Sequence, residues 1–168
     1  MPVPSWVVGQ ILTASDVDSW FVPLAAYKTA DQSVTSSTTL VNDSELVVAV
    51  AASAVYFVRC YLNFEGGTAG SSDLKWGWTV PASATFRYTW AGWNNTGSVA
   101  RAGDGQTATD TPSSATAGAG NLHGVMMTGT LAVAASAGNM QFKWAQNTSS
   151  ATSTIVHAQS ALVLDRIS

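Results

Sequence analysis

The stretch from Leu74 to Trp93 constrains the fold of this chain more than any other segment. Apolar or aromatic residues occupy every second position over 74–80 and again over 86–90, with small or polar residues between them. Successive side chains leave opposite faces of a β-strand, so this alternation predicts two half-buried strands. The connector between them, residues 81–84, is short and begins with Pro81. The pattern therefore predicts a β-hairpin.

The apolar face of this stretch includes four large aromatic side chains: Trp76, Trp78, Tyr88 and Trp90. Each large aromatic side chain buries about 150–250 Å² when it is covered, so a face of this size needs a covering layer or a ligand. One explanation is the core of a β-sandwich, where aromatic residues at alternate strand positions usually lie. The other is a platform on which sugar rings stack. Of the two, the alternation favours the core.

From Tyr27 to the C-terminus, further β-type patterns recur between turn residues. Asn42, Asp43 and Ser44 predict a turn between the first two of these strands. The regular spacing of strands and turns predicts an all-β fold, an antiparallel β-sandwich that is jelly-roll-like and has about eight strands. This domain spans residues 27–168. Its predicted strands lie near residues 33–41, 45–52, 54–64, 73–80, 85–93, 123–134, 140–147 and 154–166.

Residues 1–26 have a different pattern and are predicted to form an N-terminal docking arm with a short helix. Thr13 is the expected N-cap of that helix, with Asp16 at its third position, and Pro23 ends it. A helix of one or two turns is not stable alone, so the arm must dock on its own body or on a neighbour. The side chains expected to make that assembly contact are Trp6, Val17, Trp20 and Phe21.

The segment 94–121 is a polar stretch of 28 residues, counted from 94 to 121, with few apolar side chains. A segment of this length without strands or helices is unusual in a compact domain, and such loops are commonly functional. We expect it to lie outside the core, either against a subunit or at an exposed binding tip.

Charged residues make up only 10% of the chain, whereas an ordinary soluble domain has roughly 25%. So few charges predict that copies of the chain cover much of its surface, and a trimer is the expected oligomer.

The net charge of −3 argues against a nucleic-acid partner. The apolar run from Leu46 to Val58 is too short to span a membrane, so no membrane partner is expected. The first basic residue is Lys28, so no ordinary signal peptide is expected.

No motif of catalytic or metal-binding residues is found in the sequence. It lacks a nucleophile elbow, a phosphate-binding glycine loop, an HExxH motif and a CxxC motif. His123 and His157 have no second His or Cys at ligand spacing, and Cys60 lies in an apolar strand pattern that predicts burial. Acidic residues beside predicted turns, such as Asp43, are expected to be solvated. We therefore expect no catalytic residue, no metal, no cofactor and no enzymatic activity.

The segment WVVGQILTASDVDSW, residues 6–20, resembles the N-terminal segment of many tailed-phage virion proteins. Residues 27–56, 73–88 and 142–164 resemble a β-rich domain of actinobacteriophages that is identified as a minor tail protein. The resemblance implies a self-associating virion component of the minor tail or fibre type, assembled in the host cytoplasm among other virion proteins. Host-surface glycan binding is a further expectation. The alternatives are a capsid decoration protein and, from another class, a carbohydrate-binding module.

Overall fold

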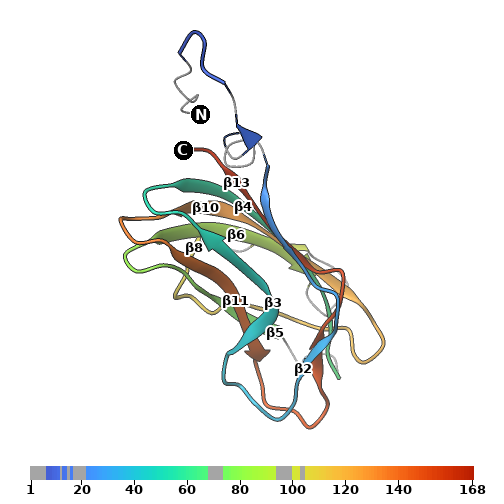
Figure 1. Cartoon of the computed structure of the whole chain (residues 1–168). Helices are drawn as coiled ribbons and strands as arrows, with labels where there is room; N and C mark the ends of the chain where they lie inside the picture. Colours follow the sequence, from blue (N-terminus) through green and yellow to red (C-terminus); the bar gives the residue numbers. More distant parts are fainter. Residues whose placement is uncertain are drawn as a thin grey trace.

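The computed structural model describes residues 7–11, 13–14, 16, 22–67, 74–93, 100–102 and 105–168 (Figure 1). Its strands form two antiparallel sheets, one large and one small. The described strands are β1 (Leu24–Tyr27), β2 (Gln32–Val34), β3 (Val41–Val50), β4 (Val55–Glu65), β5 (Leu74–Thr79), β6 (Thr85–Trp93), β7 (Ala100–Ala102), β8 (Gln106–Thr107), β9 (Ser113–Ser114), β10 (His123–Ala132), β11 (Gly138–Gln146), β12 (Thr154–Val156) and β13 (Ala161–Arg166).

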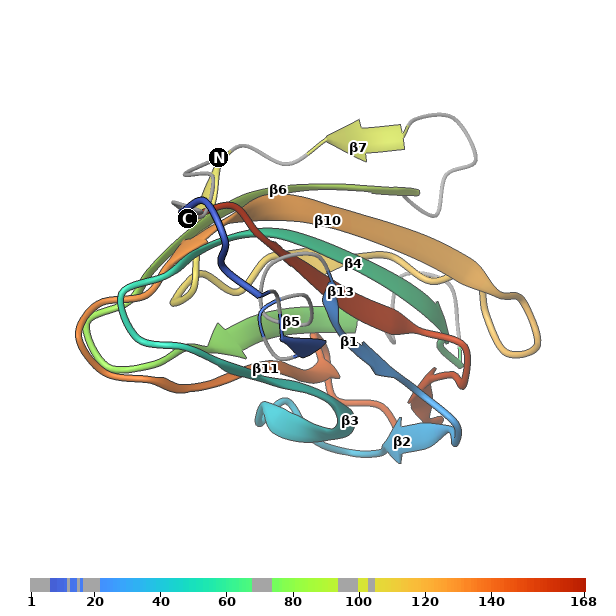
Figure 2. The same cartoon turned by 45° about the horizontal axis from the view of Figure 1, so that its top comes forward.

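The strand order is that of a jelly roll. The large sheet runs β1-β13-β4-β10-β6-β7, and the small sheet runs β3-β11-β5-β9. The pairs β1–β13, β3–β11, β4–β10 and β5–β9 are nested, as if one long hairpin had been wrapped into two layers. Strand β6 adds a further long strand to the large sheet, beyond β10. Figure 2 shows the two layers facing each other. The predicted antiparallel sandwich of jelly-roll type is therefore confirmed.

The predicted hairpin between β5 and β6 is wrong. β5 lies between β11 and β9 in the small sheet, whereas β6 lies beside β10 in the large sheet. The connector crosses from one layer to the other in a turn closed by a hydrogen bond from the Ala84 amide to the Pro81 carbonyl, 3.0 Å long. Both strands face the same interior from opposite layers. Their alternation is therefore correct, although the assumed pairing is not.

Three further boundaries differ from the predicted ones. The sequence Asn42-Asp43-Ser44 lies inside β3 and not in a turn. The predicted last strand is split into β12 and β13, separated by a turn in which the Ser160 amide bonds to the His157 carbonyl. The first strand begins at Leu24, inside the predicted arm, and pairs with β13. The sandwich therefore starts before residue 27.

The segment 94–121 is not simply a loop outside the core. Its described part contains β7, β8 and β9. The amides of Trp76 and Trp78 donate to the carbonyls of Pro112 and Ala108, at 3.1 and 3.3 Å. Ser114 and Thr116 are buried. This stretch therefore covers the outer edge of β5 and accepts hydrogen bonds from main-chain amides that an open edge would expose to solvent.

A buried ionic cluster joins the start of the large sheet to the small sheet. Lys28, directly after β1, places its ammonium 3.1 and 3.0 Å from the two carboxylate oxygens of Asp43 on β3. Both side chains are fully buried. Asp43 also accepts hydrogen bonds from the main-chain amide of Leu46 and the indole of Trp144. The expectation that Asp43 is solvated is therefore wrong. Lys28 makes its burial possible, and this partner lies 15 residues away in the sequence, so the local pattern does not reveal it.

No helix of the described residues has both the length and the apolar character that crossing a membrane requires.

Candidate functional site

The outer face of the large sheet carries a row of apolar side chains that no other part of the described chain covers. Strand register places its members side by side across five strands, from β1 through β13, β4 and β10 to β6. We call this set the apolar row. Its larger members are 57%, 44% and 59% exposed, in the order Tyr27, Tyr61, Met126. The apolar row consists of Tyr27, Ala161, Tyr61, Met126 and Ala91.

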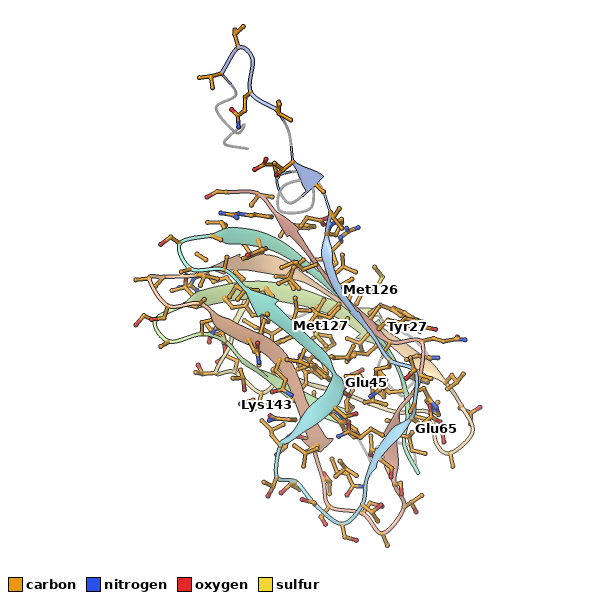
Figure 3. All side chains as sticks on the ribbon, viewed as in Figure 1. Tyr27, Glu45, Glu65, Met126, Met127 and Lys143 are labelled. Atoms are coloured by element: carbon orange, nitrogen blue, oxygen red, sulfur yellow. The ribbon has the colours of Figure 1, made fainter. Side chains whose placement is uncertain are left out.

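The strand pleat explains why these side chains point outward. Met126 and Met127 are neighbours on β10 and leave opposite faces, so Met127 is buried in the core and Met126 is exposed. Figure 3 shows Met127 among the side chains between the layers and Met126 toward the outer side. On the row's flank, Gly124 lies under the Tyr61 ring. A Cβ at this position would come within 3.2 Å of that ring. The glycine therefore leaves Tyr61 room to lie against the sheet.

A hollow next to the apolar row has a different chemical character. It is a shallow depression of about 470 Å³ that is largely open to solvent. Short threonine side chains on β6 and β10 form its floor, and larger side chains stand on either side. We call this depression the hollow. Its lining residues are Phe57, Arg87, Tyr88, Thr89, Gly105, Thr128, Gly129 and Thr130.

The described part of the N-terminal arm has its apolar side chains in solvent. Residues 7–11 lie well away from the sandwich (Figure 1). Val7 is 68% exposed, Ile11 is 85% exposed, and Val8 is fully exposed. Such a segment has apolar surface available for a partner.

The predicted helix start has the hydrogen bonds of an N-cap. The Asp16 carboxylate accepts from the Thr13 hydroxyl at 2.6 Å and from the Thr13 amide at 3.0 Å, while the Asp16 amide donates to the Thr13 hydroxyl at 3.3 Å. These bonds lower the pKa of Asp16 below its usual value. Ala14 and Asp16 have helical backbone conformation. The four predicted docking residues Trp6, Val17, Trp20 and Phe21 lie outside the described residues.

The four predicted aromatic residues of the central stretch lie in the core. Trp76, Trp78, Tyr88 and Trp90 are each at most 6% exposed, so their faces are closed to a sugar. Rings from the two layers meet edge to face, with the Trp76 and Trp90 centroids 5.1 Å apart. The Nε1 atoms of the three tryptophans and the Tyr88 hydroxyl are buried, and none of them has a hydrogen bond of normal geometry among the described residues. Burial raises the pKa of Tyr88 to about 12. The Trp76 and Trp78 side chains still lie close enough to the Tyr88 hydroxyl to lower its pKa, but burial has the larger effect.

The buried hydroxyls of Tyr88 and Tyr56 differ in their hydrogen bonding, and this difference gives a test of the core. Tyr88→Phe removes a buried hydroxyl that makes no hydrogen bond of normal geometry, so we expect the free energy of unfolding to rise by about 1 kcal/mol. The matched change Tyr56→Phe removes a hydroxyl that accepts from the Ala51 amide at 3.0 Å, and we expect a loss of about 1 kcal/mol. Urea unfolding of both variants measures the two values. Equal losses in both would contradict the assignment of an unpaired Tyr88 hydroxyl.

The remaining titratable groups form no metal site among the described residues, where no group of three or more His, Cys, Asp or Glu side chains could hold a metal ion. His157 places Nδ1 3.2 Å from Asp31 and Nε2 3.7 Å from Glu65, so the two carboxylates lie on different sides of the ring. The Ala158 amide, and to a lesser extent His157, lower the pKa of Asp31. Cys60 is buried, and its burial raises the pKa of the thiol.

Comparison with known proteins gives no family for the chain. No family model matches it, and no curated protein matches it. Among solved structures, one of infectious bursal disease virus (Gx strain) is 9% identical with a TM-score of 0.22 and covers 86% of this chain and 36% of that chain. Another, of the Gt strain, is 14% identical with a TM-score of 0.20 and covers 99% of this chain and 45% of that chain. The chain thus spans less than half of either, and scores this low carry no argument about fold or function.

Proposed function

We propose that this chain is a structural protein of a tailed bacteriophage virion, a surface component of the minor tail or fibre type. In this role it self-associates and is held on the particle by its N-terminal arm. The resemblance of residues 6–20 and of the β-rich body to actinobacteriophage virion proteins supports the proposal. The jelly roll is compatible with it, since viral capsid domains are among those with this architecture.

The observation that carries the proposal is the uncovered apolar surface of the arm. Val7, Val8 and Ile11 lie in solvent on a segment that extends from the body. Full burial of one such side chain stabilises by about 1.5–3 kcal/mol on area bookkeeping. Ordering the segment costs part of that gain, so a single arm binds weakly and an array of copies binds firmly. A protein repeated on a virion provides that array.

The apolar row supplies the surface for self-association. It crosses the large sheet and has no charged member, and the chain as a whole has few charges. Exposed apolar surface on a sheet face favours contact with another copy, and closed symmetry limits the oligomer size. We expect a trimer in which the apolar row is covered and the hollow beside it stays open.

Multi-angle light scattering tests the self-association. At micromolar concentration, the full chain is expected to have a mass three times 17.4 kDa. The double change Tyr61→Glu and Met126→Lys places charges in the apolar row without altering net charge, and we expect monomers. Leu122→Lys is a control at a side chain that is equally exposed, at 58%, outside the row. A monomeric unaltered chain, or a trimer that persists in the double variant, would contradict this part of the proposal.

A capsid decoration protein is the alternative position within the virion. Gold-labelled antibody against the sandwich, viewed on whole particles by electron microscopy, separates the two. We expect label on the tail, whereas label spread over the head would replace the tail assignment with the decoration role.

A further inference from the structure

The register of three strands builds the walls of the hollow from chemically different side chains. Phe57 on β4 and Arg87 on β6 are both paired with Thr130 on β10, which lies between them. Neighbouring strands are about 4.8 Å apart, so the two flanking positions are separated by about 10 Å. Two residues along β10, on the side toward the apolar row, Thr128 is paired with Thr89. The hollow, whose exposed surface is mainly apolar, is therefore bounded by an aromatic ring on one side and a guanidinium on the other, with threonine side chains between them.

The hydroxyls of Thr89, Thr128 and Thr130 are on exposed residues, and no hydrogen bond of theirs is found among the described residues. Each hydroxyl can donate one hydrogen bond and accept others. The ring of Phe57 is 39% exposed at the edge of this array. A sugar ring has the complementary features, since its C–H face packs on an aromatic ring and its hydroxyls both donate and accept.

The positive charge of Arg87 at the wall of the hollow favours a ligand that carries a negative charge. Arg59, which is paired with Thr128 from the other side, is neutralised by Asp165 at 2.7 Å. No such ion pair is found for Arg87 within the described part of the chain. Among the described residues, the Arg87 charge at the wall therefore has no carboxylate partner. A guanidinium binds a carboxylate through two parallel hydrogen bonds, which fixes the orientation of the ligand.

From these three features we infer that the hollow binds an acidic saccharide, with its carboxylate on Arg87, its ring against Phe57 and its hydroxyls on the threonines. The site is separate from the buried tryptophans, for which sugar stacking was the less favoured of the two explanations. Only the source of the ligand, a glycan of the host surface, rests on the proposed function.

Titration of the isotope-labelled full chain with glucuronate, followed by amide chemical shifts, tests the inference. We expect saturable shifts confined to residues 57, 87–89, 105 and 128–130. Glucose, which lacks the carboxylate, is expected to bind about tenfold more weakly or worse, since a charge-assisted contact is lost. Arg87→Gln should lower the affinity for glucuronate by a similar factor and remove the preference over glucose. Phe57→Ala should weaken both sugars.

Lys143→Gln is the matched control, because it makes the same charge change on β11 of the small sheet. We expect no change in glucuronate affinity. Equal binding of glucose and glucuronate, an unchanged affinity in Arg87→Gln, or shifts by acetate alone that match those of glucuronate would each overturn the inference. Such a failure is distinguishable from failure of the proposed function, since an Arg87→Gln chain that binds no sugar still assembles onto particles if the arm anchors it.

Discussion

Asp43→Ala is expected to lower the free energy of unfolding by about 3–5 kcal/mol, the range found when one partner of a buried ion pair is removed. The Lys28 ammonium would stay fully buried without the two oxygens that now lie 3.1 and 3.0 Å away. The Leu46 amide and the Trp144 indole would lose their acceptor at the same time. Urea unfolding monitored by tryptophan fluorescence measures the loss.

Glu45→Ala serves as the control for this change. Glu45 also approaches Lys28, at 3.7 Å, but its side chain is partly exposed, so its removal should cost much less. Replacing both buried partners, as in Lys28→Met with Asp43→Leu, should cost less than Asp43→Ala alone, because no unpaired charge remains. A loss below about 1 kcal/mol for Asp43→Ala would show that the pair is not buried in solution.

Deletion of residues 2–21 is expected to leave a folded body that no longer joins virions. The first strand, β1, begins at Leu24 and pairs with β13 from Leu24 to Tyr27, so this deletion spares every described strand. Its circular dichroism and unfolding midpoint should match those of the full chain. Deletion of residues 2–26 is the informative comparison, because it removes most of β1 and leaves the edge of β13 open. We expect that variant to be clearly less stable.

The strands could be predicted from the sequence because alternation reports directly on burial. β5, β6 and β11 lie close to their predicted bounds for this reason. The partner of each strand could not be predicted in the same way. The aromatic faces of β5 and β6 would have the same sequence pattern as neighbours in one sheet or as opposing members of two sheets. Only the full set of pairings distinguishes these cases.

Asp43 shows a second limit of sequence analysis. The local sequence Asn-Asp-Ser is typical of a turn, yet the carboxylate is buried because Lys28 reaches it from a different strand. The apolar row was missed for a related reason. β4 carries aromatic side chains on both faces, with Tyr56 buried and Tyr61 exposed, so residue type does not reveal the outward face. The hollow likewise depends on the register of β4, β10 and β6.

Anchoring by the arm is tested by the number of copies of this chain on purified virions, counted by quantitative mass spectrometry. The natural chain is to be replaced in the phage either by the 2–21 deletion or by the full chain with Lys143→Gln as a control. Anchoring by the arm predicts a fixed copy number for the full chain and for the control, and near absence of the deleted chain despite normal folding. Full occupancy by the deleted chain would contradict anchoring by the arm, and absence of the full chain from virions would contradict its role as a virion protein.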